Sequence, residues 1–309
     1  MIALVCPGQG SQTPGFLTSW LDFPEFRESI EQMSEASGID LIAHGTVSDA
    51  ETIRDTSIAQ PLIVAASVAS AALLSARAGE SFAKITGIAG HSVGEVSAAV
   101  VAGIFDAPTG TRFVRERGNA MAMAAALEAT SMAAVVGGDS TEVLQSIDDA
   151  GLYPANFNGS GQIVAAGSAE KIGELVANPP SGSRVIALSV AGAFHTRYMQ
   201  PAVATLADYA NSVTVSDPSL RIWSNREGSA ISDGRDFVDR LVSQVSSPVR
   251  WDLCMESMSA HGITKIIELV PGGTLSGLAK RGMPGVEAIA LKTPENLEVA
   301  LAALKNADI

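Results

Sequence analysis

The sequence predicts an α/β fold with a mostly parallel sheet, into which a small ferredoxin-like subdomain is inserted. Short β-branched runs alternate with longer alanine-rich helical stretches, which is typical of strands joined by crossover helices. Between residues 130 and 191 the order changes to β-α-β-β-α-β, that of a ferredoxin-like unit. With 309 residues, of which 47% are apolar and 17% charged, the chain can bury a large core, and intrinsic disorder is excluded.

The chain divides accordingly into a first core segment (1–129), the inserted subdomain (130–191) and a second core segment (192–309). In the first segment Pro61 is expected in the first turn of a helix, where its missing N–H costs nothing. The elements predicted for this segment are the strands Ile2–Cys6 and Ile85–Ala89 and the helices Leu62–Ala76, Val93–Ala102 and about Thr111–Leu127.

The other two segments continue the alternation of short apolar runs and helical stretches. The inserted subdomain is predicted to contain the strand Met132–Gly137, the helix Thr141–Asp149, the strands Tyr153–Asn158 and Gln162–Gly167, the helix Ala169–Ala177 and the strand Arg184–Val190. The second core segment is predicted to contain a helix from about Thr196, the strand Arg221–Ser224, a helix around Asp236–Ser246 and the strand Lys265–Val270, followed by the loop Pro271–Gly273.

Charge balance and cysteine content restrict the partners and the compartment. The net charge is −13 and no basic block relieves it, so nucleic acid and anionic membranes are poor candidates for partners. Two cysteines, Cys6 and Cys254, are too few for a disulfide framework or a cysteine-based zinc site, and no metal is expected. The N-terminus lacks a signal-peptide pattern, and the uncharged stretch Leu62–Ala76 is shorter than the ~20 residues of a bilayer-spanning helix. We therefore expect a soluble, cytoplasmic protein.

The pentapeptide Gly90-His91-Ser92-Val93-Gly94 matches the Gly-x-Ser-x-Gly nucleophile elbow of an α/β-hydrolase-like core. An apolar strand ends directly before it and a helix begins directly after it. The serine is therefore expected at the top of the sheet, near the positive end of the helix. The two glycines fit a sharp turn with no room for a side chain beside the strand and the helix. The alternative is a serine that merely caps the helix.

A serine hydroxyl is a weak nucleophile at neutral pH and needs a base. His91 adjoins Ser92 across the turn and is expected to point away in a structural role. His44 and His261 lie in polar stretches typical of exposed helix ends. His195 directly follows a predicted strand, where α/β sheets build their sites. On position alone His195 is the best candidate base, and a packed or capping histidine is the alternative.

Several different short motifs are distributed along the whole chain. They are Pro7-Gly8-Gln9-Gly10-Ser11-Gln12, GHSVGE at 90–95, Arg117-Gly118 with Met121, Asn156-x-Asn158 with Gly161-Gln162, GAFHT at 192–196, Gln244 before Pro248-Val249, and Pro271-Gly272-Gly273 before Leu275. In this order and spacing they resemble the malonyl-CoA–acyl carrier protein transacylase family of fatty-acid synthesis. Two positions depart from the family pattern: Cys6, where a larger apolar residue is expected, and Phe194, where some members have a smaller one.

This resemblance implies that Ser92 is acylated, with His195 as its base. The main-chain carbonyl of Gln244, instead of an aspartate, would orient the histidine, and a neutral acceptor can fix the imidazole tautomer. The main-chain N–H groups of Gln9 and Val93 would form the oxyanion hole. The reaction implied is malonyl transfer from malonyl-CoA to the phosphopantetheine thiol of acyl carrier protein, through a malonyl-serine intermediate and with no cofactor.

Arg117 is the candidate residue for substrate recognition. It shares a helix face with Met121, so a charge stands on an otherwise apolar face. Such a charge needs a partner, which is either a structural ion pair or the free carboxylate of a malonyl group, held by two parallel hydrogen bonds. The resemblance favours the carboxylate, with Met121 and Phe194 lining the acyl pocket. Arg112 and Arg115 face elsewhere and are expected on the solvated surface.

Two other functions share parts of this pattern. A serine thioesterase or hydrolase of the α/β-hydrolase type has the same elbow, but its histidine lies in a late loop that follows the acid. Here a long segment with at least two strands follows His195. A catalytically idle scaffold of the same fold would be expected to lack Ser92, His195 or Arg117.

Acyl carrier protein and coenzyme A thioesters are the partners that the resemblance implies. Carrier proteins of this family are acidic, as is this chain, so docking would need a local basic patch. The candidates for that patch are Lys280, Arg281 and Lys292.

Overall fold

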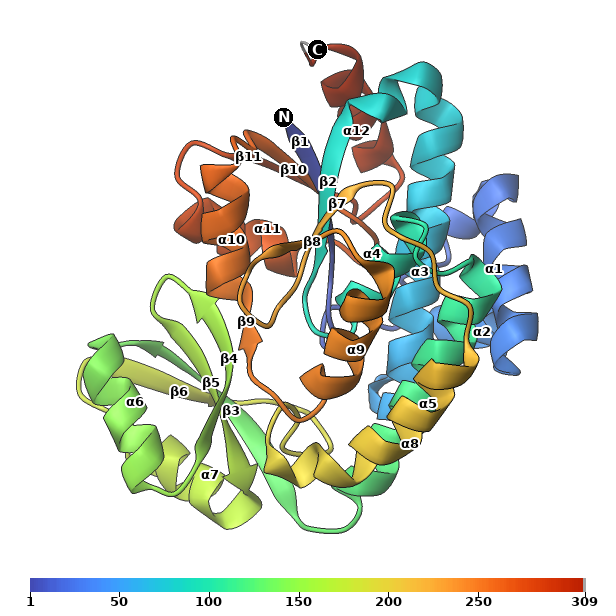
Figure 1. The fold of residues 1–309 in the computed structure, drawn as a ribbon. Coiled ribbons are helices and arrows are strands. Elements are labelled where there is room, and N and C mark those ends of the chain that lie inside the picture. The colour runs from blue at the N-terminus through green and yellow to red at the C-terminus, as the bar shows by residue number, and fades with distance from the viewer. Residues whose placement is uncertain (308–309) are drawn as a thin grey trace.

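Two β-sheets organise the chain in the computed structural model, which describes residues 1–307 (Figure 1). The larger sheet holds β1 (Ile2–Cys6), β2 (Ile85–Gly90), β7 (Arg221–Trp223), β8 (Ala230–Ile231), β10 (Lys265–Glu268) and β11 (Glu287–Ala290). Their order is β11-β10-β1-β2-β7-β8, and every neighbouring pair is parallel except β7 with β8. The smaller sheet holds β3 (Thr130–Gly137), β4 (Tyr153–Gly159), β5 (Gln162–Ser168), β6 (Ser183–Ala187) and β9 (Val249–Arg250). The predicted α/β fold with a mostly parallel sheet is confirmed.

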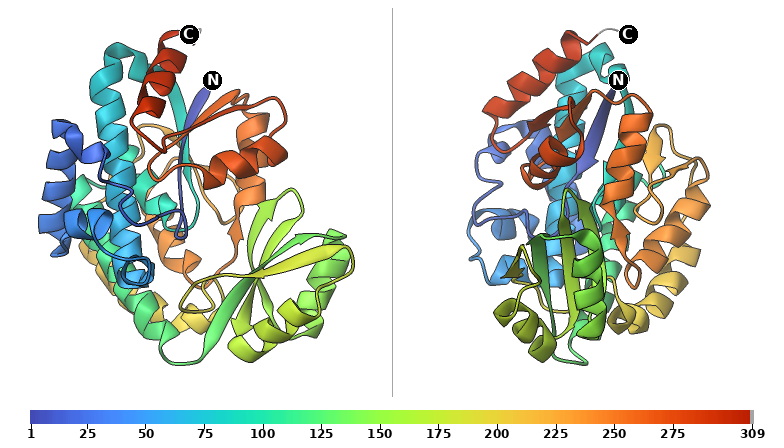
Figure 2. Two further views of the ribbon diagram at one scale, coloured as in Figure 1. Left: turned by 180° about the vertical axis from the view of Figure 1, so that it is seen from behind. Right: turned by 90° about the vertical axis from the view of Figure 1, so that its left-hand side faces the viewer.

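Helices connect the strands and cover the sheets. They are α1 (Pro24–Ser37), α2 (Leu41–Thr46), α3 (Thr56–Ala78), α4 (Gly94–Val101), α5 (Ala107–Ala125), α6 (Ser140–Asp149), α7 (Ala169–Ala177), α8 (Gln200–Ser212), α9 (Gly234–Gln244), α10 (Trp251–Ala260), α11 (Thr274–Gly282) and α12 (Glu295–Lys305). In both views of Figure 2 the smaller sheet with α6 and α7 forms a lobe at the end of the molecule away from the two termini.

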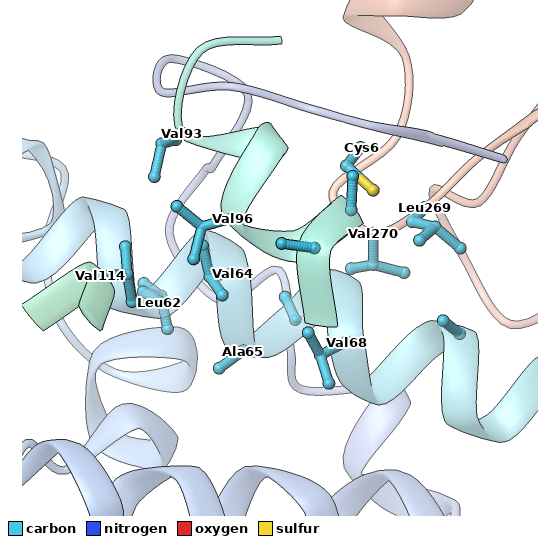
Figure 3. Packing of buried hydrophobic residues seen from close by; sticks show 14 of the residues in the cluster. Cys6, Leu62, Val64, Ala65, Val68, Val93, Val96, Val114, Leu269 and Val270 are labelled. Carbon is cyan, nitrogen blue, oxygen red and sulfur yellow. The ribbon is translucent and has the colours of Figure 1, made fainter. Parts of the chain in front are cut away.

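Strand β1 lies inside the larger sheet and is buried on both faces. Ile2, Leu4 and Cys6 belong to a hydrophobic cluster with residues of α3 and α4, part of which Figure 3 shows. Ala3 and Val5 belong to a second cluster, with residues of α10 and α11. Because both faces are covered, the strand is a continuous apolar run in the sequence, not an alternating one.

Helix α3 begins earlier than the sequence analysis expected. We expected Pro61 in the first turn, but the helix starts at Thr56 and Pro61 lies inside it. Asp55 sets the earlier start, because its carboxylate accepts a hydrogen bond from the Ser57 N–H at 2.8 Å. Proline cannot donate to the carbonyl four residues before it. That carbonyl, of Ser57, accepts from Arg115 Nη1 at 3.2 Å instead. Arg115 is therefore half-buried, and the expectation of a solvated side chain was wrong.

The same helix is long and apolar enough to cross a membrane, judged by length and composition alone. Residues Thr56–Lys84 meet that criterion, but 83% of their most apolar window is buried inside the protein. Helices α1, α5 and α12 pack against α3. The expectation of a buried core helix at Leu62–Ala76 is therefore confirmed.

The smaller sheet comes almost entirely from one continuous segment. Its order is β6-β3-β5-β4-β9, and the four strands β3 to β6 pair antiparallel. Residues of α6 and α7 join it in a separate hydrophobic cluster. Strand β9 pairs parallel with β4 and leads directly into α10. The predicted strand Arg184–Val190 ends already at Ala187, and Leu188 and Val190 line a cavity between the two sheets.

Candidate functional site

Ser92 stands in a sharp turn between β2 and α4, at the carboxyl end of the larger sheet. Its φ of 52° lies in the left-handed region, which is uncommon for a residue with a side chain. Hydrogen bonds hold the turn from both sides. The His91 N–H donates to the Cys6 carbonyl at 3.0 Å, and the Ser92 N–H donates to Asn225 Oδ1 at 2.8 Å. Ser92 does not cap α4, because the N-cap position belongs to Val93.

The two flanking glycines are required because the turn is crowded. A Cβ atom on Gly90 would collide with the main chain of Gly94 and Glu95. A Cβ atom on Gly94 would collide with the Cys6 carbonyl of the neighbouring strand. The expected lack of room for a side chain on either side of the serine is thus confirmed.

His195 faces Ser92 from the chain that follows β6. Its Nε2 lies 2.7 Å from Ser92 Oγ, and its Nδ1 lies 2.9 Å from the main-chain carbonyl oxygen of Gln244. A carbonyl can only accept, so Nδ1 carries the proton and Nε2 is free to accept from the serine hydroxyl. The residue has a φ of 62°, and its N–H donates to the Val245 carbonyl at 3.0 Å. The backbone therefore fixes the ring in one place.

The surroundings keep the His195 imidazole neutral. Burial, and after it the charge of Arg117, lower its pKa to about 3, although the Gln244 carbonyl acts in the opposite direction. A neutral imidazole can take a proton at Nε2. The ring is therefore in the form a general base needs across the physiological pH range.

Arg117 reaches the same centre from α5 and is fully buried. Nη1 donates to Gln60 Oε1 at 2.7 Å, and Nη2 donates to Gln244 Oε1 at 2.9 Å. Nη2 also lies 3.5 Å from Ser92 Oγ. Within residues 1–307 its Nε has no hydrogen-bond partner and no carboxylate lies within ion-pair distance. The structural ion pair considered above is therefore not formed, and one N–H of a buried guanidinium is left unpaired.

Sequence reasoning missed a buried carboxyl group, that of Glu95 in the first turn of α4. It accepts hydrogen bonds from the Asn225 N–H at 2.5 Å and from Gln244 Nε2. Burial raises the pKa of Glu95 to about 8, while the Asn225 N–H and the charge of Arg117 act to lower it. The signal was present in GHSVGE, where an acidic residue opens an otherwise apolar helix. Asn225 was also missed, although it lies only two residues after the end of β7.

A cavity of about 260 Å³ opens above Ser92, between the two sheets. Ser92, His195, Gln9 and Val93 line it, as expected for residues that meet a substrate. The main-chain N–H groups of Gln9 and Val93 donate to no other group in the part of the chain described here. Two donors are thus available beside Ser92.

Met121 and Phe194 also line the cavity, and both are buried. The Met121 sulfur accepts from Gln60 Nε2 at 3.4 Å, and the other end of that amide holds Arg117. Arg117 does not itself line the cavity. It lies one layer deeper, in contact with the lining residues Gln60 and Ser92.

The remaining histidines lie outside the Ser92–His195 contact. His91 lines the cavity wall and is 2.8 Å from Asn158 Oδ1, and burial lowers its pKa. His261 is exposed at the end of α10, as expected, whereas His44 is half-buried against Ser48. Across residues 1–307 no group of three or more His, Cys, Asp or Glu side chains could hold a metal ion.

Comparison with known proteins identifies the family. Residues 3–293 match the family model of the acyl transferase domain. The malonyl CoA-acyl carrier protein transacylase of Mycobacterium bovis is 46% identical over 96% of this chain and 98% of its own length. The chain belongs to the malonyl CoA-acyl carrier protein transacylase family of acyltransferases. The Escherichia coli K12 transacylase is 34% identical to this acyltransferase, over 97% of this chain and 98% of that protein.

Solved structures of the family share the fold. A crystal structure of the Mycobacterium tuberculosis transacylase superimposes with a TM-score of 0.93 at 46% identity, covering 98% of this acyltransferase and 99% of that chain. A malonyl-transacylase solved in complex with its type II polyketide acyl-carrier protein gives a TM-score of 0.91 at 30% identity, with 98% and 99% coverage. The resemblance inferred from the sequence motifs is therefore confirmed.

Proposed function

We propose that this acyltransferase moves a malonyl group from malonyl-CoA to the phosphopantetheine thiol of acyl carrier protein, through a malonyl ester on Ser92. The observation that carries the proposal is the contact of 2.7 Å between Ser92 Oγ and His195 Nε2, with Arg117 Nη2 at 3.5 Å from the same oxygen. The proposed base and the proposed carboxylate-binding cation thus both lie next to the nucleophilic oxygen of Ser92. Family membership supports the same substrates, and the product would supply the extender unit for fatty-acid synthesis.

In the first half-reaction, Ser92 Oγ attacks the thioester carbonyl carbon of malonyl-CoA while its proton moves to His195 Nε2. The C–S bond then breaks, and the proton passes from Nε2 to the coenzyme A sulfur, which leaves as a thiol. The Gln244 carbonyl holds Nδ1–H and stabilises the charged ring while it carries the second proton. The malonyl group remains as an ester on Ser92.

In the second half-reaction, the carrier-protein thiol gives its proton to His195 Nε2 and attacks the same carbonyl carbon. The C–O bond to Ser92 breaks, Oγ regains the proton, and malonyl-carrier protein leaves. In both halves the carbonyl oxygen becomes negative for a moment. We assign the oxyanion hole to the free main-chain N–H groups of Gln9 and Val93, the latter at the N-terminus of α4.

Arg117 is assigned to the free carboxylate of the malonyl group. In the ester, only the carbonyl carbon and one methylene separate Ser92 Oγ from that carboxylate, so a guanidinium 3.5 Å from Oγ is within reach. The unpaired Nε–H and the adjacent Nη form the planar edge that binds a carboxylate with two hydrogen bonds. Met121 and Phe194 would bound the acyl pocket. No cofactor takes part in this scheme.

A serine thioesterase or hydrolase is not favoured. The partner of His195 Nδ1 is a main-chain carbonyl, whereas a hydrolase triad places an acidic side chain there. The relatives named above are transacylases along nearly the full length of this chain.

The docking surface for the carrier protein is proposed at the end of α11. Lys280 and Arg281 are exposed in its last turn, and Lys292 is exposed after β11. Leu275 and Leu278 of the same helix line the cavity, so a carrier protein bound there would lie beside its wall. The complex of a related transacylase with its carrier protein supports such a partner. The buried, free thiols of Cys6 and Cys254 fit a cytoplasmic location.

The finer description of the fold is also a proposal. We assign residues 130–191 to a ferredoxin-like subdomain, inserted between residues 1–129 and 192–309 of an α/β-hydrolase-like core. The order β3-α6-β4-β5-α7-β6 and the antiparallel pairing support the first assignment. The elbow between β2 and α4 supports the second.

Incubation with malonyl-CoA, followed by intact mass and peptide mapping, tests the proposed function. Wild type should gain one malonyl group on the peptide that contains Ser92 and release it to carrier protein. Ser92→Ala should show neither adduct nor transfer. An adduct that persists in Ser92→Ala would contradict the assigned nucleophile. Rapid release of free malonate without carrier protein would favour a hydrolase.

A further inference from the structure

The buried carboxyl group of Glu95 has no part in the reaction scheme above. It lies in the first turn of α4, fully enclosed, below the elbow. One oxygen accepts from the Asn225 N–H and the other accepts from Gln244 Nε2, so the group acts as an acceptor at both ends. Each of these two partners contacts the reacting groups.

Asn225 connects Glu95 to the elbow. Its Oδ1 accepts from the Ser92 N–H at 2.8 Å, and its Nδ2 donates to the Gly90 carbonyl at 2.7 Å. The two bonds flank His91 and hold the chain directly before the strained residue Ser92, which has positive φ. The main chain of Asn225 is in turn held by Glu95.

Gln244 connects Glu95 to the base and to the guanidinium. Its main-chain carbonyl accepts from His195, and its side-chain Oε1 accepts from Arg117. A glutamine amide has one donor end and one acceptor end. Because Glu95 accepts from Nε2, Oε1 is the end that faces Arg117. A reversed amide would bring two sets of donors face to face.

We propose that Glu95 is a positioning residue for the transfer reaction, which acts by fixing Asn225 and Gln244 and, through them, the elbow, the base and the guanidinium. The proposal rests on the roles assigned under the proposed function. Three parts of the chain that lie far apart in sequence meet at this one carboxyl group: α4, the residue two positions after β7, and the end of α9. Glu95 touches no reacting atom and is therefore not a catalytic residue.

Glu95→Gln is the first test, because it keeps the shape and removes one acceptor. The new amide can accept from Asn225 or from Gln244, but its NH₂ group then faces the other donor. We expect kcat/KM for malonyl-CoA to fall about 10- to 100-fold, the effect of leaving one buried donor without its acceptor. The loss of kcat/KM with acetyl-CoA should be smaller, because an acetyl group has no carboxylate and therefore does not depend on the position of Arg117.

Exchanging the pair gives a readout that a purely structural role would not produce. In the double variant Glu95→Gln/Gln244→Glu, the amide at position 95 accepts from the Asn225 N–H and donates to the carboxylate at position 244. The second oxygen of that carboxylate accepts from Arg117. Acetyl transfer should return to within about threefold of wild type, since coupled residues compensate each other. Malonyl transfer should stay low, because the new carboxylate occupies Arg117 directly and repels the carboxylate of the substrate.

Glu116→Gln is the matched control. Glu116 precedes Arg117 on α5 and makes no side-chain hydrogen bond or ion pair within the described chain, so its variant should match wild type. Two results would overturn the positioning role: wild-type kinetics in Glu95→Gln, or a loss equal for both acyl-CoAs, with a lowered melting temperature and no recovery in the exchanged pair. If Ser92→Ala kept the adduct, the proposed function would fail instead. If Ser92→Ala lost it while Glu95→Gln behaved as wild type, only the present inference would fail.

Discussion

Replacing Arg117 by methionine distinguishes a role of this residue in substrate recognition from a role in stabilising the fold. The guanidinium is fully buried, and its bonds to Gln60 and Gln244 exist before any substrate binds. Methionine keeps most of the volume and removes the charge. The damage to these two glutamines is the same whichever acyl group arrives, so it cancels in the ratio of malonyl to acetyl transfer. That ratio therefore reports the carboxylate contact alone.

The size of the effect follows from the contacts that the substrate loses. A hydrogen bond to a charged group contributes about 1.5–3 kcal/mol, and removing one partner of a buried pair costs about 3–5 kcal/mol. Malonyl kcat/KM in Arg117→Met should therefore fall roughly 10²- to 10³-fold, at about 1.36 kcal/mol for each factor of ten. Acetyl transfer should stay level or rise, because wild type leaves the guanidinium without its anion when acetyl binds.

The assay is kcat/KM for acylation by malonyl-CoA and acetyl-CoA, read from coenzyme A release. Arg117→Lys should recover only part of the malonyl rate, since an ammonium cannot make the two-pronged contact. Arg112→Met is the control on the same helix, where the native side chain is exposed and reaches only Thr109. Equal losses for the two acyl groups in Arg117→Met would refute the assignment and leave Arg117 a residue of the core.

Two further predictions concern the base and the elbow. His195→Ala should lose about 10²- to 10⁴-fold in acylation rate. Because the pKa of His195 is about 3, wild-type kcat/KM should not fall as pH drops through 6.5, the ordinary histidine value. In Arg117→Met burial still lowers this pKa but the charge of Arg117 no longer does, so the acid limb should move to higher pH. Profiles of kcat/KM against pH that coincide in wild type and Arg117→Met would show that the charge of Arg117 does not lower the pKa of His195. Gly90→Ala should melt well below wild type because its Cβ collides with Gly94, whereas Gly173→Ala on α7, with open space around it, should not; equal melting temperatures would show that the elbow relaxes easily.

Continuous apolar strands were the most predictable part of the fold. The run Ile2–Cys6 has the bounds seen in the structure, because a central parallel strand is apolar on both faces. Boundaries set by local side-chain bonds were harder to predict. Asp55 caps α3 well before Pro61, and no hydrophobic period marks that start. The short edge strands β8 and β9 carry too few residues to show any period.

The site was predictable where one residue carries a recognisable chemical role. A serine between glycines, a histidine after a strand and an arginine on an apolar face each stand out in the sequence, and the structure brings all three to one oxygen atom. Residues that act through others were missed. Glu95 and Asn225 meet only after distant segments fold together, so no spacing along the chain links them.

The position of Arg117 links selectivity to the state of the base. A cation beside the serine attracts the carboxylate of a malonyl group, and the same charge disfavours protonation of His195. A malonyl carboxylate bound to Arg117 would offset that charge and let the ring take the serine proton more readily. The substrate would thus raise the basicity of the group that activates the nucleophile against it. Acetyl-CoA has no carboxylate to offset the charge, so we expect it to acylate Ser92 more slowly for this reason as well as through weaker binding.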